Sequence, residues 1–204
     1  FDVYQGQNVE IYLFAAPPAR NLQGILWKNI REAFHRHPTF DKKLIRSLKI
    51  ERGKDIIEGV IIPTHGTSEE KVSKASGKHA PYLIFLIDEA DAVPDEIFTG
   101  IDGCASGGEV RIICSFNPKK RYGYVYNAIQ SGRATLVKLC SFDHPNVIEG
   151  RTVIKGAVTR NYVVDATNEW TTPIPDSDVR WDESDAPQGV FKVPSFLVGS
   201  TSIT

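Results

Sequence analysis

Two adjacent acidic residues follow the most apolar run of the sequence. Asp88 and Glu89 come directly after residues 82–87, which are apolar at every position. The carboxyl ends of buried strands are where α/β sheets bind their ligands. A first acid there can hold Mg²⁺ through water against phosphate oxygens, and a second can orient and deprotonate an attacking water. The pair therefore indicates nucleotide hydrolysis, with Asp88 as the magnesium acid and Glu89 as the general base, although two acids after an apolar strand also occur without this chemistry.

A second strand end carries polar side chains of the same kind. Residues 110–114 read as a strand, and Ser115, Phe116, Asn117 and Pro118 follow it. In motor ATPases, a polar residue on the strand beside the acidic pair contacts the γ-phosphate or the attacking water. Ser115 and Asn117 fit that role, while Asn117-Pro118 also fits a simple turn.

The elements that must position these residues alternate between strands and helices. Hydrophobic periodicity, capping signals and helix-stopping prolines divide the chain. The predicted strands are 8–14, 56–62, 82–87, 110–114 and 135–139, and the predicted helices are 21–35, a short one starting at Thr67, 94–101, 122–130 and 159–170. Such alternation is typical of a doubly wound α/β fold with a mainly parallel sheet. The uninterrupted apolar run at 82–87 predicts a central strand buried on both faces.

Charge and composition exclude several classes of protein. The 204 residues carry a net charge of −1, and no apolar run approaches the length of a membrane span. Without a secretory signal, we expect a cytoplasmic protein that does not bind membranes. Basic residues nevertheless gather at 42–54 and 119–121, and acidic ones at 176–185. Each cluster is compatible with solvated surface or with a binding role.

The motifs on the two strand ends resemble one protein family. The segments HAPYLIFLIDEADAVPDEIF and GCASGGEVRIICSFNP are similar to the ATPase domain of the phage terminase large subunit. Upstream, AAPPARNLQGILWKNIR is similar to the strand, loop and helix that follow the first strand of that family's sheet. Downstream, SFDHPNVIEG and GAVTR extend the resemblance, so that it covers most of residues 9–170 in the family's order.

The resemblance implies a fold, an activity and partners. The fold would be a RecA-like, P-loop NTPase-type α/β domain, with a mainly parallel sheet flanked by helices. The activity would be hydrolysis of ATP with Mg²⁺ to drive double-stranded DNA into phage capsids in the cytoplasm of the bacterial host. Partners would be a terminase small subunit, a portal protein and further copies in a ring.

The same resemblance assigns roles to individual residues. Asp88 would hold Mg²⁺ through water, and Glu89 would be the catalytic base. Ser115 and Asn117 would belong to a motif that couples hydrolysis to movement. Arg20 and Gln23 would contact nucleotide or DNA. Arg160 would approach the nucleotide or a neighbouring subunit, or simply lie on a helix surface.

The sequence departs from the family in what it lacks. It contains no G-x-x-x-x-G-K-[ST] phosphate loop, begins at Phe1 and has no methionine. We expect a piece of a longer protein, incomplete at the N-terminus and without the family's nuclease domain. Residues 1–170 would form the partial ATPase domain, and 171–204 a linker or the start of a following domain. Within it, 190–198 would either form an edge strand or lead toward a second domain. Such a chain should be inactive alone.

Two other interpretations remain open. Residues 88–91 spell Asp-Glu-Ala-Asp, as in DEAD-type helicases, although the next motif here is Ser-Phe-Asn-Pro instead of the helicase Ser-Ala-Thr. The chain could also be a non-catalytic prophage remnant or a binding scaffold.

Overall fold

The computed structural model describes residues 2–172. The chain divides into two compact units, Phe1–Thr135 and Leu136–Thr204. The linker and edge strand predicted within 171–204 fall almost entirely outside the described residues, so the division between 1–170 and 171–204 stays a prediction.

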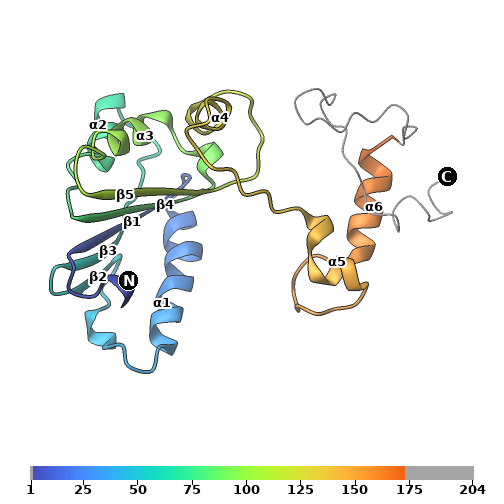
Figure 1. The fold of residues 1–204 in the computed structure, drawn as a ribbon, viewed down its shortest axis with the longest axis horizontal. Coiled ribbons are helices and arrows are strands. Elements are labelled where there is room, and N and C mark those ends of the chain that lie inside the picture. Colours follow the sequence, from blue (N-terminus) through green and yellow to red (C-terminus); the bar gives the residue numbers. More distant parts are fainter. Residues whose placement is uncertain (1, 173–204) are drawn as a thin grey trace. The chain divides into compact units, whose positions relative to one another are not determined.

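The first unit is built on a five-stranded sheet in the order β2-β3-β1-β4-β5 (Figure 1). The strands are β1 (Val9–Ala15), β2 (Lys49–Arg52), β3 (Asp55–Gly59), β4 (Tyr82–Asp88) and β5 (Glu109–Ser115). β1 pairs in parallel with β3 and β4, and β4 in parallel with β5, whereas β2 is antiparallel to β3. The predicted α/β class with a mainly parallel sheet is therefore confirmed, and the architecture is compatible with a RecA-like fold.

Helices cover both faces of this sheet. α1 (Trp27–Arg36) lies on one face, and α2 (Ser68–Ala75) and α3 (Asp95–Asp102) lie on the other (Figure 1). The π-helical segment η2 (Asn21–Leu26) leads directly into α1, so the region predicted as a single helix is helical throughout. Short 3₁₀ turns complete the unit at η1 (Asp2–Tyr4), η3 (Lys42–Leu44) and η4 (Ala90–Ala92).

Local capping signals place two of these helices as expected. Thr67 accepts a hydrogen bond from the backbone N–H of Glu70, and Glu70 accepts one from the N–H of Thr67. This reciprocal capping box satisfies two backbone donors that the first turn of α2 leaves unpaired. Pro94 directly precedes α3, where its fixed φ suits the entry into a helix.

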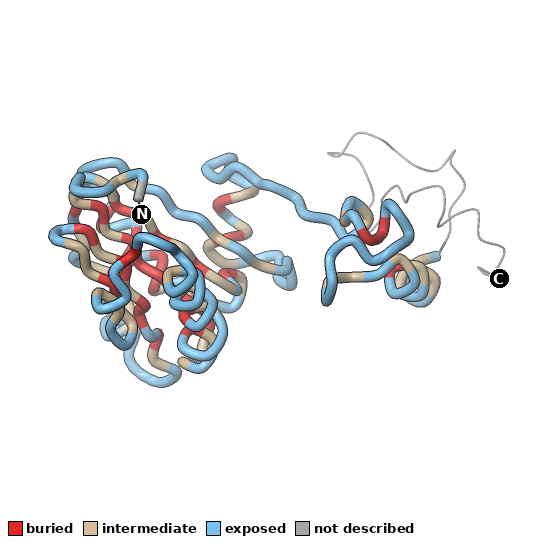
Figure 2. Tube along the Cα trace, turned by 90° about the horizontal axis from the view of Figure 1, so that it is seen from below, coloured by how far each residue is buried: buried red, intermediate tan, exposed pale blue. Residues whose placement is uncertain are grey.

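A separate hydrophobic cluster lies on each face of the sheet. Figure 2 marks the buried residues along the chain in red. β1 contributes to both clusters, because nearly all of its residues are buried. β4 alternates instead: Leu83, Phe85 and Ile87 are buried on the α2–α3 side, while Ile84 and Leu86 are half-buried at the margin of the α1-side cluster. The prediction that 82–87 is buried on both faces was therefore correct for only one face, since the cluster around α1 is centred on β1.

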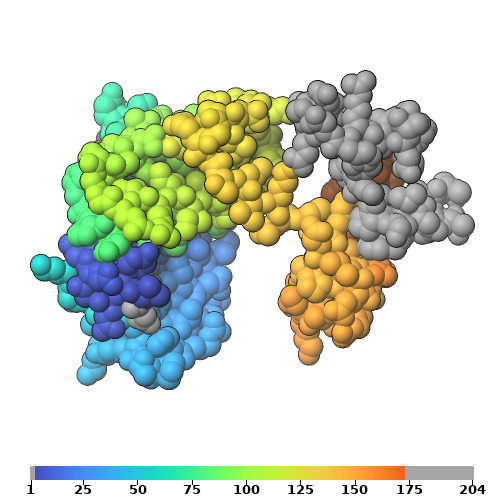
Figure 3. All heavy atoms as spheres, viewed as in Figure 1, coloured from blue at the N-terminus to red at the C-terminus, as the bar shows by residue number. Residues whose placement is uncertain are grey.

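Helix α4 (Tyr124–Gln130) lies on the same side of the sheet as α3. Phe98 of α3 stacks on Tyr124 of α4, with ring centroids 4.4 Å apart and planes 8° from parallel. The atoms of this region form a continuous surface in the space-filling view (Figure 3). α4 thus fixes the far end of the loop that follows β5.

The sequence analysis missed one strand and wrongly predicted another. β2 was not predicted, because Lys49, Ile50 and Glu51 lie in a stretch rich in basic residues. In the structure, Ile50 is fully buried. Residues 135–139 were predicted as a strand, but no described strand pairs with them, and Leu139 is 95% exposed. A β-prone segment forms a strand only where a neighbour completes its hydrogen bonds.

The second unit is described over residues 136–172. It holds η5 (Ser141–Asp143), α5 (Pro145–Glu149) and α6 (Arg160–Trp170). Buried Asn146 accepts from the N–H groups of Val153 and Ile154 and donates to the carbonyls of Ile154 and Val158. All of its amide groups are therefore satisfied, which fixes the loop between the two helices.

Candidate functional site

The carboxyl ends of three parallel strands lie side by side. Ala15 of β1 pairs with Asp88 of β4, and Asp88 pairs with Ser115 of β5. The Ser115 hydroxyl donates a hydrogen bond of 2.7 Å to Oδ1 of Asp88. Parallel pairing in register therefore brings together two side chains that the sequence separates by a whole helix and its loops, as the sequence analysis predicted for the two strand ends.

Glu89 has an unusual backbone conformation. Its φ of 53° and ψ of 40° lie in the left-handed region, which few residues other than glycine occupy. The backbone turns there from β4 into η4, closed by a hydrogen bond of 2.8 Å from the N–H of Ala92 to the carbonyl of Glu89. The side chain is exposed. Strained residues of this kind concentrate at functional sites, and this one carries the predicted general base.

The loop after β5 is attached to the turn after β4. The N–H of Lys119 donates to Oδ2 of Asp91 at 3.2 Å, and Nζ of Lys120 donates to the backbone carbonyl of Asp91 at 2.8 Å. Asn117 is exposed on this loop between Ser115 and the attached residues. Sequence analysis noted Asp91 only as the last residue of the Asp-Glu-Ala-Asp run and assigned it no role of its own.

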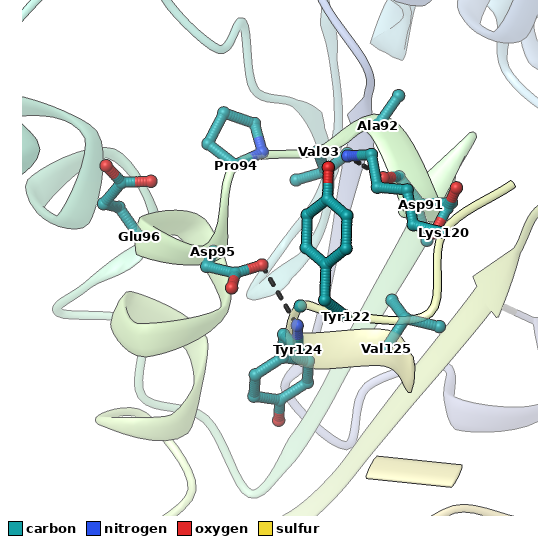
Figure 4. A pocket seen from close by; sticks show the side chains of 12 residues that line it. Asp91, Ala92, Val93, Pro94, Asp95, Glu96, Lys120, Tyr122, Tyr124 and Val125 are labelled. Carbon is teal, nitrogen blue, oxygen red and sulfur yellow. Dashed lines mark hydrogen bonds between the residues drawn. The ribbon is translucent and has the colours of Figure 1, made fainter. Parts of the chain in front are cut away.

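A pocket of about 330 Å³ opens between these two segments (Figure 4). Its lining comes from residues 90–96 on one side and from Lys120 and residues 122–125 on the other. Tyr122 projects into it, and Asp95 accepts a hydrogen bond of 3.1 Å from the N–H of Tyr124 (Figure 4). Burial, together with a hydrogen bond to Asp102, raises the pKa of Tyr124 to about 12.

The remaining predicted residues lie on the segment that follows β1. Arg20 and Gln23 are exposed at the start of η2, after the turn at Pro17 and Pro18. Asn21, between them, donates from its amide to the carbonyl of Ala16 at 2.9 Å. Among the contacts of the described residues, none joins Arg20 or Gln23 to Asp88 or Glu89, so the roles of these two residues stay predictions.

Arg160 lies in the second unit, and its predicted approach to the nucleotide or to a neighbouring subunit stays a prediction. Its guanidinium donates to the backbone carbonyls of Val147 and Ile148, in the second unit. These bonds satisfy carbonyls at the end of α5, which the helix itself leaves unpaired. Arg160 thus has a structural role in joining α5 to α6.

The oxygen atoms at the strand ends fit a magnesium ion that retains most of its water. In residues 2–172, no group of three or more His, Cys, Asp or Glu side chains is placed to hold a metal. Mg²⁺ usually binds through one or two carboxylates and otherwise keeps waters and phosphate oxygens. Asp88, half-buried and held by Ser115, could supply that carboxylate.

The basic stretch at 42–54 is partly neutralised. Glu51 pairs with Lys49 at 2.7 Å and with Arg46 at 3.9 Å, and Asp55 pairs with Arg52 at 3.7 Å. Lys42, Lys43 and Lys54 are exposed.

None of the described helices is long and apolar enough to cross a membrane.

Part of this sequence is similar to a phage protein. It is described as "Probable terminase, large subunit" and comes from Enterobacteria phage P7. The identity is 38% over 53 residues, which is 26% of this chain and 11% of that protein. No protein-family model and no solved structure matches the chain. The similarity agrees with the predicted family over this limited stretch, and the chain spans only a small part of the length of that relative.

Proposed function

We propose that this chain is part of a phage terminase large subunit and supplies the magnesium and general-base residues of its ATPase. The observation that supports this best is the hydrogen-bonded pair of Asp88 and Ser115 at neighbouring strand ends, with strained Glu89 directly beside it. The similarity to the phage P7 protein points to the same family. The motor would use ATP hydrolysis to move double-stranded DNA into a capsid.

Each residue has a distinct part in the proposed reaction. Asp88 holds the hydrated Mg²⁺, which when bound neutralises charge on the phosphate oxygens. Ser115 donates to Asp88 and thereby fixes the orientation of the carboxylate. Glu89 accepts a proton from the attacking water. Asn117, on the loop after β5, lies where it could contact the terminal phosphate or that water.

In the proposed motor, the phosphate-binding loop would come from outside these 204 residues, which contain no G-x-x-x-x-G-K-[ST] motif. Such a loop surrounds the phosphates with backbone N–H groups and supplies a lysine and a hydroxyl for Mg²⁺. We therefore expect negligible ATP hydrolysis by this chain alone.

DNA contact is the least direct part of the proposal. Exposed Lys42, Lys43 and Lys54 offer positive charge on the first unit. A motor that accepts every sequence should hold the DNA backbone through phosphate contacts and leave the bases unread. Its DNA affinity should accordingly fall steeply with added salt.

The test is Mg²⁺-dependent ATP hydrolysis by two forms of the protein. One is this chain, and the other is the chain extended toward the N-terminus along its own reading frame to include a phosphate loop. Each is measured unaltered and as Glu89→Gln. We expect turnover only from the extended, unaltered form, with a loss of at least about a hundredfold on substitution of the general base.

A matched control keeps the same chemical change away from the site. Glu109→Gln alters an exposed acid at the opposite end of β5, where Glu109 pairs with Arg111, and should leave turnover unchanged. Full activity in Glu89→Gln would remove Glu89 as the base. An extended form that is silent with and without DNA would instead favour the non-catalytic scaffold, and RNA-stimulated unwinding would favour the helicase.

A further inference from the structure

The turn after β4 and the loop after β5 are joined at two places. At the strand ends, Ser115 donates to Asp88 at 2.7 Å. Farther out, the carboxylate of Asp91 accepts from the N–H of Lys119 and its carbonyl accepts from Nζ of Lys120. Glu89 lies between the two joints on one segment, and Asn117 lies between them on the other.

We infer that Asp91 is a positioning residue of the proposed ATPase site: it holds the loop that carries Asn117 at a fixed distance from the turn that carries Glu89. This inference rests on the proposed function. Asp91 would touch neither nucleotide nor metal, and would act through the backbone of the two segments that it joins.

The sheet cannot hold these two residues together by itself. The pairing of β4 with β5 ends at Asp88 and Ser115, and both Glu89 and Asn117 lie beyond it. Beyond Asp88 and Ser115, the distance between Glu89 and Asn117 depends on contacts between the turn after β4 and the loop after β5. Both bonds at Asp91 join these two segments, one through its carboxylate and the other through its backbone carbonyl. Together they restrain the rotation of the segments as well as the distance between them.

The position of Pro118 strengthens this argument. It stands between Asn117 and Lys119, and the proline ring fixes its own φ near −65°. When the N–H of Lys119 is held by Asp91, the rigid proline transmits that restraint to Asn117. A catalytic geometry misplaced by about 1 Å can lose about a hundredfold in rate, so a restraint of this kind has a kinetic consequence.

The first test compares variants in the extended form that hydrolyses ATP. Asp91→Ala removes the acceptor for Lys119 and should lower kcat at least about tenfold, with KM for Mg-ATP changed less than about twofold. Asp91→Asn keeps an acceptor oxygen and should recover kcat to within about threefold of the unaltered protein. A purely structural role would lower the amount of folded protein without this division between kcat and KM.

Asp95→Ala is the matched control. Asp95 also lines the pocket and also accepts a backbone N–H, that of Tyr124, but it does so at the start of α4 beyond the loop with Asn117 (Figure 4). Its kcat should stay within about twofold of the unaltered protein. If Asp91→Ala keeps full kcat, or if Asp91→Asn is as slow as Asp91→Ala, the inference is overturned while the proposed function stands.

The second test does not depend on hydrolysis and uses the 204-residue chain. Amide hydrogen exchange in Asp91→Ala should speed up by about tenfold or more at Lys119, whose N–H loses its acceptor. Exchange at Phe85 in the middle of β4 should not change, which shows that the fold is intact. Unchanged exchange at Lys119 would overturn the inference even if the extended form proves inactive.

Discussion

The hydroxyl of Ser115 donates a hydrogen bond of 2.7 Å to Oδ1 of Asp88, across the last paired residues of two neighbouring parallel strands. This bond occupies one carboxylate oxygen and leaves Oδ2 for another ligand. It also fixes the plane of the carboxylate before any ligand arrives. A single carboxylate contributes more to a magnesium site when a hydrogen bond already fixes its orientation.

The first prediction follows from this bond. Ser115→Ala should raise the Mg²⁺ concentration that half-saturates ATP hydrolysis by about tenfold, since loss of an outer hydrogen bond commonly costs that much in metal affinity. The measurement is a Mg²⁺ titration of turnover in the extended form. Ser73→Ala, which removes a surface hydroxyl bonded to the Glu70 carbonyl in α2, is the control. An unchanged half-saturation point in Ser115→Ala would mean that the bond does not prepare the metal site.

The second prediction concerns the buried carboxylate of Asp55, which is 1% exposed. It accepts from the N–H groups of Gly6, Asn8 and Val9 at 2.7, 3.1 and 3.3 Å, and so attaches the segment before β1 to β3. Asp55→Ala leaves these donors without their acceptor and should lower the free energy of unfolding by about 2 kcal/mol. Urea denaturation measures the change.

Asp41→Ala is the comparison for that experiment. Asp41 is exposed, and the one described hydrogen bond of its side chain is accepted from the N–H of Lys43, so removal of the carboxylate should cost about 0.5 kcal/mol. Equal losses in the two variants would show that burial adds nothing to the role of Asp55.

The third prediction concerns the contact between α2 and α3. A Cβ added at Gly100 would lie 2.5 Å from the carbonyl oxygen of Val72 and 2.9 Å from Cβ of Ala75. Gly100→Ala should therefore force the helices apart and lower the midpoint of denaturation, at a cost of about 1–3 kcal/mol. Gly24→Ala, where a Cβ meets nothing within 4 Å, should be neutral or stabilising. A Gly100→Ala protein as stable as the unaltered one would contradict this close packing.

The fourth prediction is a pH dependence. Burial and the hydrogen bond to Asp102 raise the pKa of Tyr124 from its ordinary value of 10.0 to about 12. Between these values the folded protein retains a proton that the unfolded chain has lost, so stability should fall as the pH rises from 10 toward 12. The contribution is fully present below pH 10. Urea denaturation across this range should show a smaller decline in Tyr124→Phe, and an identical decline in both proteins would rule out Tyr124 as its source.

Much of the fold could be predicted from local sequence signals. The apolar runs of β4 and β5, the capping box at Thr67 and the proline before α3 each act over a few residues, and the elements they predicted are present. The failures were of another kind. β2 exists because Ile50 finds a buried place beside β3, and residues 135–139 lack a described strand to pair with. Neither condition can be read from the segment itself.

The site shows the same division. The types and order of Asp88, Glu89, Ser115 and Asn117 were sufficient to propose a site at the two strand ends, because parallel strands bring their carboxyl ends to one edge. The contacts of Asp91 with Lys119 and Lys120 could not be predicted, because the spacing of the residues does not determine how two loops meet.

The sequence by itself therefore determined the class of fold, the position of most helices and strands, and the residues at the strand ends. Those properties depend on side-chain periodicity and on hydrogen bonds between near neighbours, which are local. Only the tertiary structure decided the strand order, the left-handed turn at Glu89 and the bonds that join Asp88 to Ser115 and Asp91 to Lys119. These arise from pairing between segments distant in the chain, whose energies are set by how the whole sheet and its loops pack together.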